Sequence, residues 1–293
     1  MSGLFGCIDT AKKPGNVART AYYGVFSLQH RGQESAGIAV NNNGSFMVHK
    51  QTGLVADSFD DVILSTLEGS AAVGTARLAS SKETGSDAIQ PILIKSRAGN
   101  IALSSSSAIL NESEIRDSLK NLGAIFQTNT DSEVILSLFS RNRVRTDDCE
   151  SAILQTMKDI KGVYSMIFMT EEKLIGVRDP YGMRPLVLGR KDDIWMLSSE
   201  TCALDALDAE FIRDLEPGEI ISISNTGKIT STFFDDSEDS SEKRVNDGKV
   251  CIFEYVYVAR PDSVIDGSSI YESRVKTGMA LAKEHPCDCD LVI

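Results

Sequence analysis

Ser2 is the first residue of the chain whose type and place could do chemistry. An initiator methionine is removed readily when a small residue follows, so we expect the mature chain to begin at Ser2. An amino-terminal serine carries a nucleophilic hydroxyl together with a base, its own α-amine, that can activate it. By itself this pattern indicates a hydrolase only weakly, because many proteins begin with Met-Ser.

Asp131 is a second candidate, because the surrounding pattern predicts that it opens a helix. Thr130 and Glu133 have the spacing of a capping box and precede an apolar stretch. The positive end of a helix would stabilise a carboxylate in its first turn and hold it in a fixed direction. Asn111 and Glu114 predict a similar helix start.

The cysteines do not form a recognisable site. No C-x-x-C motif occurs, and the spacing fits neither a zinc site nor a disulfide framework. Most of them are expected to be buried small hydrophobic residues. The six are Cys7, Cys149, Cys202, Cys251, Cys287 and Cys289.

The elements that must position these residues alternate between short strands and amphipathic helices. A strand over residues 3–8 would place the start of the chain inside a sheet. Asn43-Gly44 joins two apolar runs, which predicts a hairpin over 36–50. Further strands are expected at 71–79, 91–95, 100–103, 163–169, 174–177 and 194–197, a second hairpin at 219–233, and helices at 17–28 and 152–160.

The last part of the chain has a different composition. Residues 235–242 are acidic, Ser-rich and free of apolar side chains, which is typical of a solvated linker. A β-branched and aromatic run follows at 250–258, then a predicted helix at 270–284 and an apolar run at 289–293. That last run is typical of a buried strand opening an α/β unit. Because one strand cannot build a domain, we expect a continuation that this chain lacks.

Composition excludes several function classes. The 293 residues carry 30 basic and 42 acidic side chains, a formal charge of −12, which argues against nucleic-acid or membrane binding by bulk attraction. No apolar run approaches the roughly 20 residues of a membrane span. The start of the chain lacks the basic and apolar regions of a secretory signal, so we expect a cytoplasmic protein.

Several separated motifs together resemble amidophosphoribosyltransferase, the glutamine-dependent family that starts purine synthesis. The resemblance runs through the whole chain in order. The motifs lie at residues 2–6 (SGLFG), 27–37 (SLQHRGQESAG), 130–133 (TDSE), 178–186 (RDPYGMRPL), 199–203 (SETCA), 254–263 (EYVYVARPDS) and 271–274 (YESR).

The resemblance implies both a fold and a division into domains. Residues 2–234 would form a class II glutaminase of the amino-terminal nucleophile (Ntn) hydrolase kind, an α+β fold with a four-layer αββα sandwich. Residues 235–249 would be the acidic linker. Residues 250–293 would be the joining segment and the first helix and strand of an incomplete phosphoribosyltransferase-like domain.

The chain departs from the family at the positions that perform catalysis. Ser2 stands where the family has its nucleophilic cysteine, and an alcohol is much harder to ionise than a thiol. Ser106 and Ser107 stand where the family has the Asn-Gly pair of its oxyanion hole, and losing one such donor typically costs about 10²–10³ in rate. Thr75 and Leu78 replace a histidine and a tyrosine.

The positions that bind the substrate are retained. In the family, the residues matching Arg77 and Asp131 hold the α-carboxylate and α-amine of glutamine, and Arg31 matches an arginine near the catalytic amino terminus. These residues could also be inherited without a present ligand. Cys251 matches an iron–sulfur ligand of some members, but one cysteine cannot hold a cluster, so we expect no metal and no cofactor.

Three interpretations follow. In the first, the chain is a degenerate, catalytically inactive relative that binds an amino acid such as L-glutamine, or serves in assembly as a homo-oligomer or with a full-length paralogue. In the second, it is an active amide hydrolase or glutamine amidotransferase that uses Ser2 as its amino-terminal nucleophile, with Ser106 or a backbone amide as oxyanion donor. In the third, the natural protein is longer than this chain.

Overall fold

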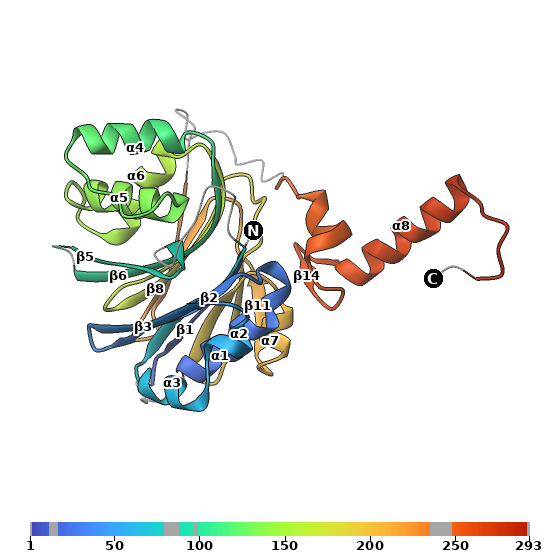
Figure 1. The fold of residues 1–293 in the computed structure, drawn as a ribbon, viewed down its shortest axis with the longest axis horizontal. Coiled ribbons are helices and arrows are strands. Elements are labelled where there is room, and N and C mark those ends of the chain that lie inside the picture. The colour runs from blue at the N-terminus through green and yellow to red at the C-terminus, as the bar shows by residue number, and fades with distance from the viewer. Residues whose placement is uncertain (1, 12–16, 79–87, 97–98, 235–247, 292–293) are drawn as a thin grey trace.

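Two antiparallel sheets form the centre of the protein, which we describe from a computed structural model over residues 2–11, 17–78, 88–96, 99–234 and 248–291 (Figure 1). The seven-stranded sheet has the order β11-β9-β10-β1-β4-β2-β3. Its strands are β1 (Ser2–Asp9), β2 (Ser35–Asn42), β3 (Ser45–Thr52), β4 (Ala71–Arg77), β9 (Val187–Lys191), β10 (Ile194–Ser198) and β11 (Glu210–Asp214).

The six-stranded sheet has the order β13-β12-β8-β7-β6-β5. Its strands are β5 (Ile92–Ser96), β6 (Gly99–Ile109), β7 (Gly162–Met169), β8 (Lys173–Arg178), β12 (Glu219–Ser224) and β13 (Ile229–Phe233). The sheets pack face to face, with Leu4 and Val73 of the first and Ile167 and Leu174 of the second in one buried cluster.

Helices cover the outer face of each sheet, so the domain has four layers, as the family resemblance implied (Figure 1). The helices α1 (Val17–Ser27), α2 (Val55–Ser58), α3 (Asp61–Thr66) and α7 (Cys202–Asp205) lie against the seven-stranded sheet. The helices α4 (Glu112–Asn121), α5 (Asp131–Arg143) and α6 (Cys149–Asp159) lie against the six-stranded sheet. Burial of apolar side chains on both faces of both sheets supplies the main driving force for this arrangement.

Local signals predicted several elements well. The β2–β3 hairpin turns at Asn43 and Gly44, both of which have the positive φ that an Asn-Gly turn requires. α5 begins at Asp131 with Thr130 as its N-cap, and the Thr130 hydroxyl accepts a hydrogen bond from the Glu133 amide at 3.2 Å. These elements depend on neighbouring residues only, which is why a sequence pattern can identify them.

Other expectations were wrong in detail. α4 begins directly after Asn111, as expected, but the Asn111 side chain makes no capping hydrogen bond; it bonds instead to the main chain at Asp159 and Lys161. β6 continues to Ile109, well beyond the predicted end at residue 103, because β7 pairs with it along this whole stretch. β9 and β11 were not expected from the sequence.

A C-terminal segment lies beyond the sandwich (Figure 1). Its run of β-branched and aromatic residues forms a π-helical turn, Glu254–Val258, although such residues favour strands. It is followed by the short strands β14 (Val264–Ile265) and β15 (Ser268–Ser269) and by α8 (Ile270–Glu284), the predicted helix. Residues 289–291 are exposed and do not form the predicted strand, and the acidic stretch 235–242 lies outside the described residues.

Candidate functional site

Ser2 lies at the start of β1, in the middle of the seven-stranded sheet, and is only 5% exposed. It pairs with Arg77 of β4 in the strand register. Its backbone nitrogen donates a hydrogen bond to the Ser106 hydroxyl of the opposite sheet at 3.1 Å. The structure therefore brings together two residues, 104 positions apart, that the sequence analysis had named as candidates.

The serines of β6 alternate between the two faces of their sheet. Ser104 faces the interior of the sandwich, where its hydroxyl lies 2.6 Å from that of Thr75. Ser105 faces the helices, and its hydroxyl lies 2.8 Å from that of Ser132 in α5. Ser107 is half-buried, with its hydroxyl 3.4 Å from that of Ser105. Thr75 with Ser104, and Ser105 with Ser132 and Ser107, thus form contacts between neutral hydroxyl groups within the chain.

The two ligand-binding candidates, Arg77 and Asp131, come from two elements that both pack against β6, namely β4 and α5. Arg77 is 3% exposed, and its guanidinium donates to the main-chain carbonyl of Ala88. Asp131 is half-buried at the start of α5, and its Oδ2 accepts a hydrogen bond from the Ile109 amide, at the end of β6, at 3.0 Å. An arginine and a helix-start aspartate suit the two charges of an amino acid.

Arg31 has a different environment. Its side chain is buried, and the guanidinium donates to Glu200 and, at 2.7 Å, to Glu254. Burial would lower the pKa of this guanidinium, but the charges of the two carboxylates raise it above its ordinary value. Arg31 therefore joins the sandwich to the C-terminal segment, and a role for it in binding a ligand stays a prediction.

Glu200 is the centre of this junction, and sequence reasoning missed it. The carboxylate also accepts hydrogen bonds from His30 at 2.7 Å, from the Arg260 amide at 2.9 Å and from the Ser263 hydroxyl at 2.6 Å. Burial would raise the pKa of Glu200, but the bond from His30 and the charge of Arg31 outweigh it and lower the pKa to about 2. Glu200 belongs to the motif at residues 199–203, but the spacing of that motif does not assign a role to its carboxylate.

A second contact fixes the same segment to the sandwich. Arg178 of β8 donates two hydrogen bonds of 2.8 Å to the carboxylate of Asp266, in the turn between β14 and β15. The same guanidinium donates to the main-chain carbonyls of Leu215 and Gly182. A bidentate arginine–carboxylate pair fixes orientation as well as distance.

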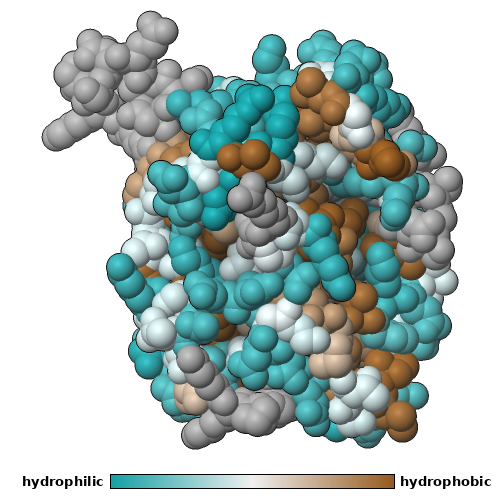
Figure 2. Space-filling view, turned by 90° about the vertical axis from the view of Figure 1, so that its left-hand side faces the viewer, coloured by the Kyte–Doolittle hydropathy of each residue, from teal (hydrophilic) through white to brown (hydrophobic). Residues whose placement is uncertain are grey.

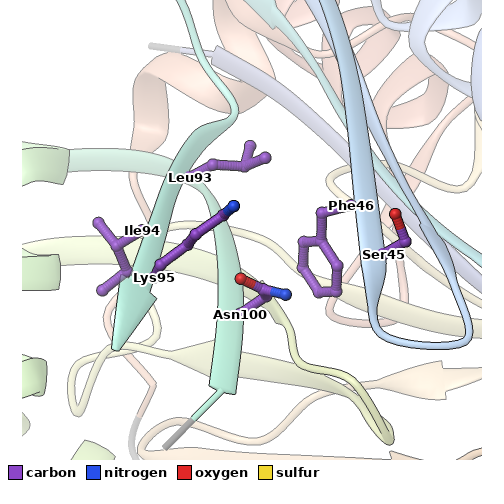
Figure 3. Close-up of a pocket in the computed structure, with 6 residues that line it drawn as sticks. All are labelled: Ser45, Phe46, Leu93, Ile94, Lys95 and Asn100. Carbon is purple, nitrogen blue, oxygen red and sulfur yellow. The ribbon is translucent and has the colours of Figure 1, made fainter. Parts of the chain in front are cut away.

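A surface pocket lies apart from these residues, between the β2–β3 hairpin and strands β5 and β6 (Figure 3). It has a volume of about 220 Å³ and is lined by Ser45, Phe46, Leu93, Ile94, Lys95 and Asn100. Figure 2 shows the side of the molecule where β3 and β5 lie, with hydrophobic residues in small patches among hydrophilic ones.

Two absences concern the described residues only. No group of three or more His, Cys, Asp or Glu side chains among them is arranged to hold a metal ion. Within the same ranges, no helix is both long and apolar enough to cross a membrane.

The fold and the sequence place the chain in a known class. Residues 75–206 match the family described as glutamine amidotransferase domain. The α+β sandwich matches the Ntn-hydrolase glutamine amidotransferase fold in the structure of glutamine phosphoribosylpyrophosphate amidotransferase from B. subtilis complexed with ADP and GMP. That match has a TM-score of 0.87 and 35% sequence identity, and covers 98% of this chain and 59% of the other.

Relatives in sequence agree with this class. The amidophosphoribosyltransferases of Methanocaldococcus jannaschii and Archaeoglobus fulgidus are 43% and 40% identical to the chain, over 100% and 99% of its length. Over its whole length, the chain is a homologue of the amidophosphoribosyltransferases. It spans 63% and 61% of these two relatives.

Proposed function

We propose that this domain binds L-glutamine and that its ability to hydrolyse the amide is lost or greatly reduced. The observation that carries the proposal is the contrast around Ser2: the charged pair Arg77 and Asp131 matches the family, whereas the Ser106 hydroxyl accepts a hydrogen bond from the Ser2 backbone nitrogen and the Thr75 hydroxyl is bonded to that of Ser104. A serine hydroxyl ionises far less readily than a cysteine thiol, so the nucleophile is weaker at neutral pH.

In this proposal the domain acts in a cytoplasmic protein of purine biosynthesis, the process that the name of its relatives indicates. Residues 250–291 would connect it to a phosphoribosyltransferase-like part, and the protein would associate with itself or with a full-length paralogue. The junction at Glu200 supports this division, because it fixes the C-terminal segment firmly to the sandwich.

One observation favours the alternative of an active amide hydrolase. The amides of Ser105 and Ile109 bond to Gln90 and Asp131, on the edge of β6 away from β7. Because backbone direction alternates along a strand, the Ser107 amide lies on this same edge and could serve as an oxyanion donor. With Met1 removed, the α-amine of Ser2 would lie beside Ser106 and could act as the base.

Calorimetric titration with L-glutamine and an assay of glutamate release together test the proposal. We expect the parent chain to bind L-glutamine without measurable turnover, and Arg77→Met and Asp131→Asn each to weaken binding at least tenfold. Failure of the parent to bind would refute the proposal. Glutamate release by the parent that Ser2→Ala abolishes would establish the active hydrolase instead. Ser2→Cys, compared with Ser2→Ala, would show whether the thiol alone restores hydrolysis.

A further inference from the structure

The short turn at residues 88–91 connects the pair Arg77 and Asp131 to β6, the strand that carries the serines at 104–107. It follows Arg77 in the sequence, ends at the start of β5, and its first three residues are nearly completely buried, with Ala88 2%, Ile89 4% and Gln90 3% exposed. Buried polar groups must find partners, so the bonds of this turn define what it holds in place.

Gln90 takes the place of a missing strand neighbour. Backbone pairing between β5 and β6 begins at Ile92 and Leu103. At Ser105, two residues further along β6, the Gln90 side chain replaces the backbone: its Oε1 accepts from the Ser105 amide at 2.6 Å and its Nε2 donates to the Ser105 carbonyl at 3.1 Å. The Gln90 side chain thus satisfies both the amide and the carbonyl of Ser105, in the middle of β6.

The turn itself is anchored on the other side. The Ala88 carbonyl accepts from Arg77, and the Ile89 carbonyl accepts from the Lys50 ammonium group at 2.9 Å. Gly37 of β2 lies directly below: a Cβ atom there would lie only 2.1 Å from the Gln90 carbonyl oxygen, so no larger residue fits. The position of the Gln90 backbone is therefore fixed against the seven-stranded sheet.

Beyond Ser105 the connection continues to Asp131. The Ser105 hydroxyl bonds to Ser132, the neighbour of Asp131 in the first turn of α5. Four residues further along the same strand, the Ile109 amide donates to the Asp131 carboxylate. A continuous series of buried contacts therefore links Arg77, through Gln90 and Ser105, to Asp131.

We propose that Gln90 is a positioning residue, which sets the spacing between Arg77 and Asp131 and so selects ligands that carry both an α-carboxylate and an α-amine. The inference rests on the proposed binding of L-glutamine. A ligand that uses both charges must match the distance between the two side chains, whereas a ligand that uses one charge can shift to follow its single partner.

This difference gives a test that a purely structural role would not pass. Gln90→Met keeps the length of the side chain and removes its hydrogen bonds. We expect it to weaken the binding of L-glutamine at least tenfold in calorimetric titration. The binding of glutaramate, which lacks the amine, and of 4-aminobutanamide, which lacks the carboxylate, should change less than twofold.

Asn41→Leu is the matched control. Asn41 is also a buried amide, 3% exposed, that bonds to the main chain, at Thr170, Glu171 and Gly44, but it holds the β2–β3 turn. We expect a comparable loss of thermal stability and unchanged L-glutamine affinity. Ser132→Ala removes the hydrogen bond to Ser105 at the other end of this series. It should weaken the binding of L-glutamine more than that of the two ligands with a single charge, by a smaller factor than Gln90→Met. It therefore tests the proposal if Gln90→Met does not fold.

The outcomes separate the two proposals. If the parent protein does not bind L-glutamine, the proposed function fails and the role of Gln90 fails with it. If the parent binds L-glutamine but Gln90→Met, or Ser132→Ala where the former does not fold, changes the affinity for all three ligands equally or for none, the positioning role is wrong while the proposed function stands.

Discussion

Two buried polar regions of this protein, the hydroxyl cluster around Ser2 and the charged junction around Glu200, provide hydrogen-bond partners for their buried polar groups in different ways. In the cluster, neutral hydroxyl groups bond to one another, as Thr75 does with Ser104. In the junction, charged groups share partners, and Glu200 accepts from two side chains of the 29–31 turn and from two residues of the C-terminal segment. Removing both members of a hydroxyl pair should reduce the stability of the protein only slightly. Removing one charged member of the junction leaves its buried partners without a counter-charge and should reduce stability much more.

The largest effect is expected at Arg31. Arg31→Ala leaves the buried carboxylates of Glu200 and Glu254 without their shared cation, which typically costs about 3–5 kcal/mol. Urea unfolding of the purified chain measures this loss. Arg19→Ala is the control, because its ion pair with Asp61 is exposed and should contribute no more than about 1 kcal/mol. Equal effects of the two variants would show that the junction is no stronger than a surface pair.

A pH titration of stability should give the next largest effect. The pKa of Glu200 is lowered from its ordinary 4.5 to about 2 in the folded protein, so the unfolded chain binds this proton more tightly. Its contribution, roughly 3 kcal/mol, is therefore present above pH 4.5 and lost as the pH falls toward 2. Urea midpoints measured across this range should fall more steeply for the parent than for Glu200→Gln. Parallel profiles would contradict the assignment.

A single change in the hydroxyl cluster should have a smaller effect. Thr75→Val removes one member of the Thr75–Ser104 pair and leaves the Ser104 hydroxyl buried without its partner, at a cost of about 1–2 kcal/mol. Urea unfolding at pH 7 provides the measurement. A loss as large as that of Arg31→Ala would remove the difference between the two regions.

The sequence predicts what depends on neighbouring residues. The strand at Ser2, the Asn43-Gly44 turn and the Thr130 cap each follow from a local pattern, and the structure has all three. The positions of Ser2, Ser106 and Asp131 near one strand could be expected from the family resemblance, whereas the bonds of Thr75 to Ser104 and of Ser105 to Ser132 could not.

The junction around Glu200 and the two hydrogen bonds between Gln90 and Ser105 could not be predicted, because the partners lie far apart in the chain. Arg31 and Glu254 are 223 positions apart, and no spacing rule connects them. The same contacts explain the helical turn at 254–258: Glu254 bonds to Arg31, and the Tyr255 carbonyl accepts from Arg274 of α8, so tertiary bonds override a composition that favours a strand.

The smallest effect is expected when both hydroxyls of the neutral pair are removed together. Thr75→Val combined with Ser104→Ala leaves neither group unpaired, so the double variant should be within about 1 kcal/mol of the parent and more stable than Thr75→Val alone. Urea unfolding of the parent, both single variants and the double variant measures the coupling. Strict additivity of the two losses would show that the hydroxyls do not depend on each other. No equivalent rescue exists at the junction, because Glu200 also accepts from the Arg260 amide and the buried Ser263 hydroxyl, and both would lose this partner if Glu200 were replaced together with Arg31.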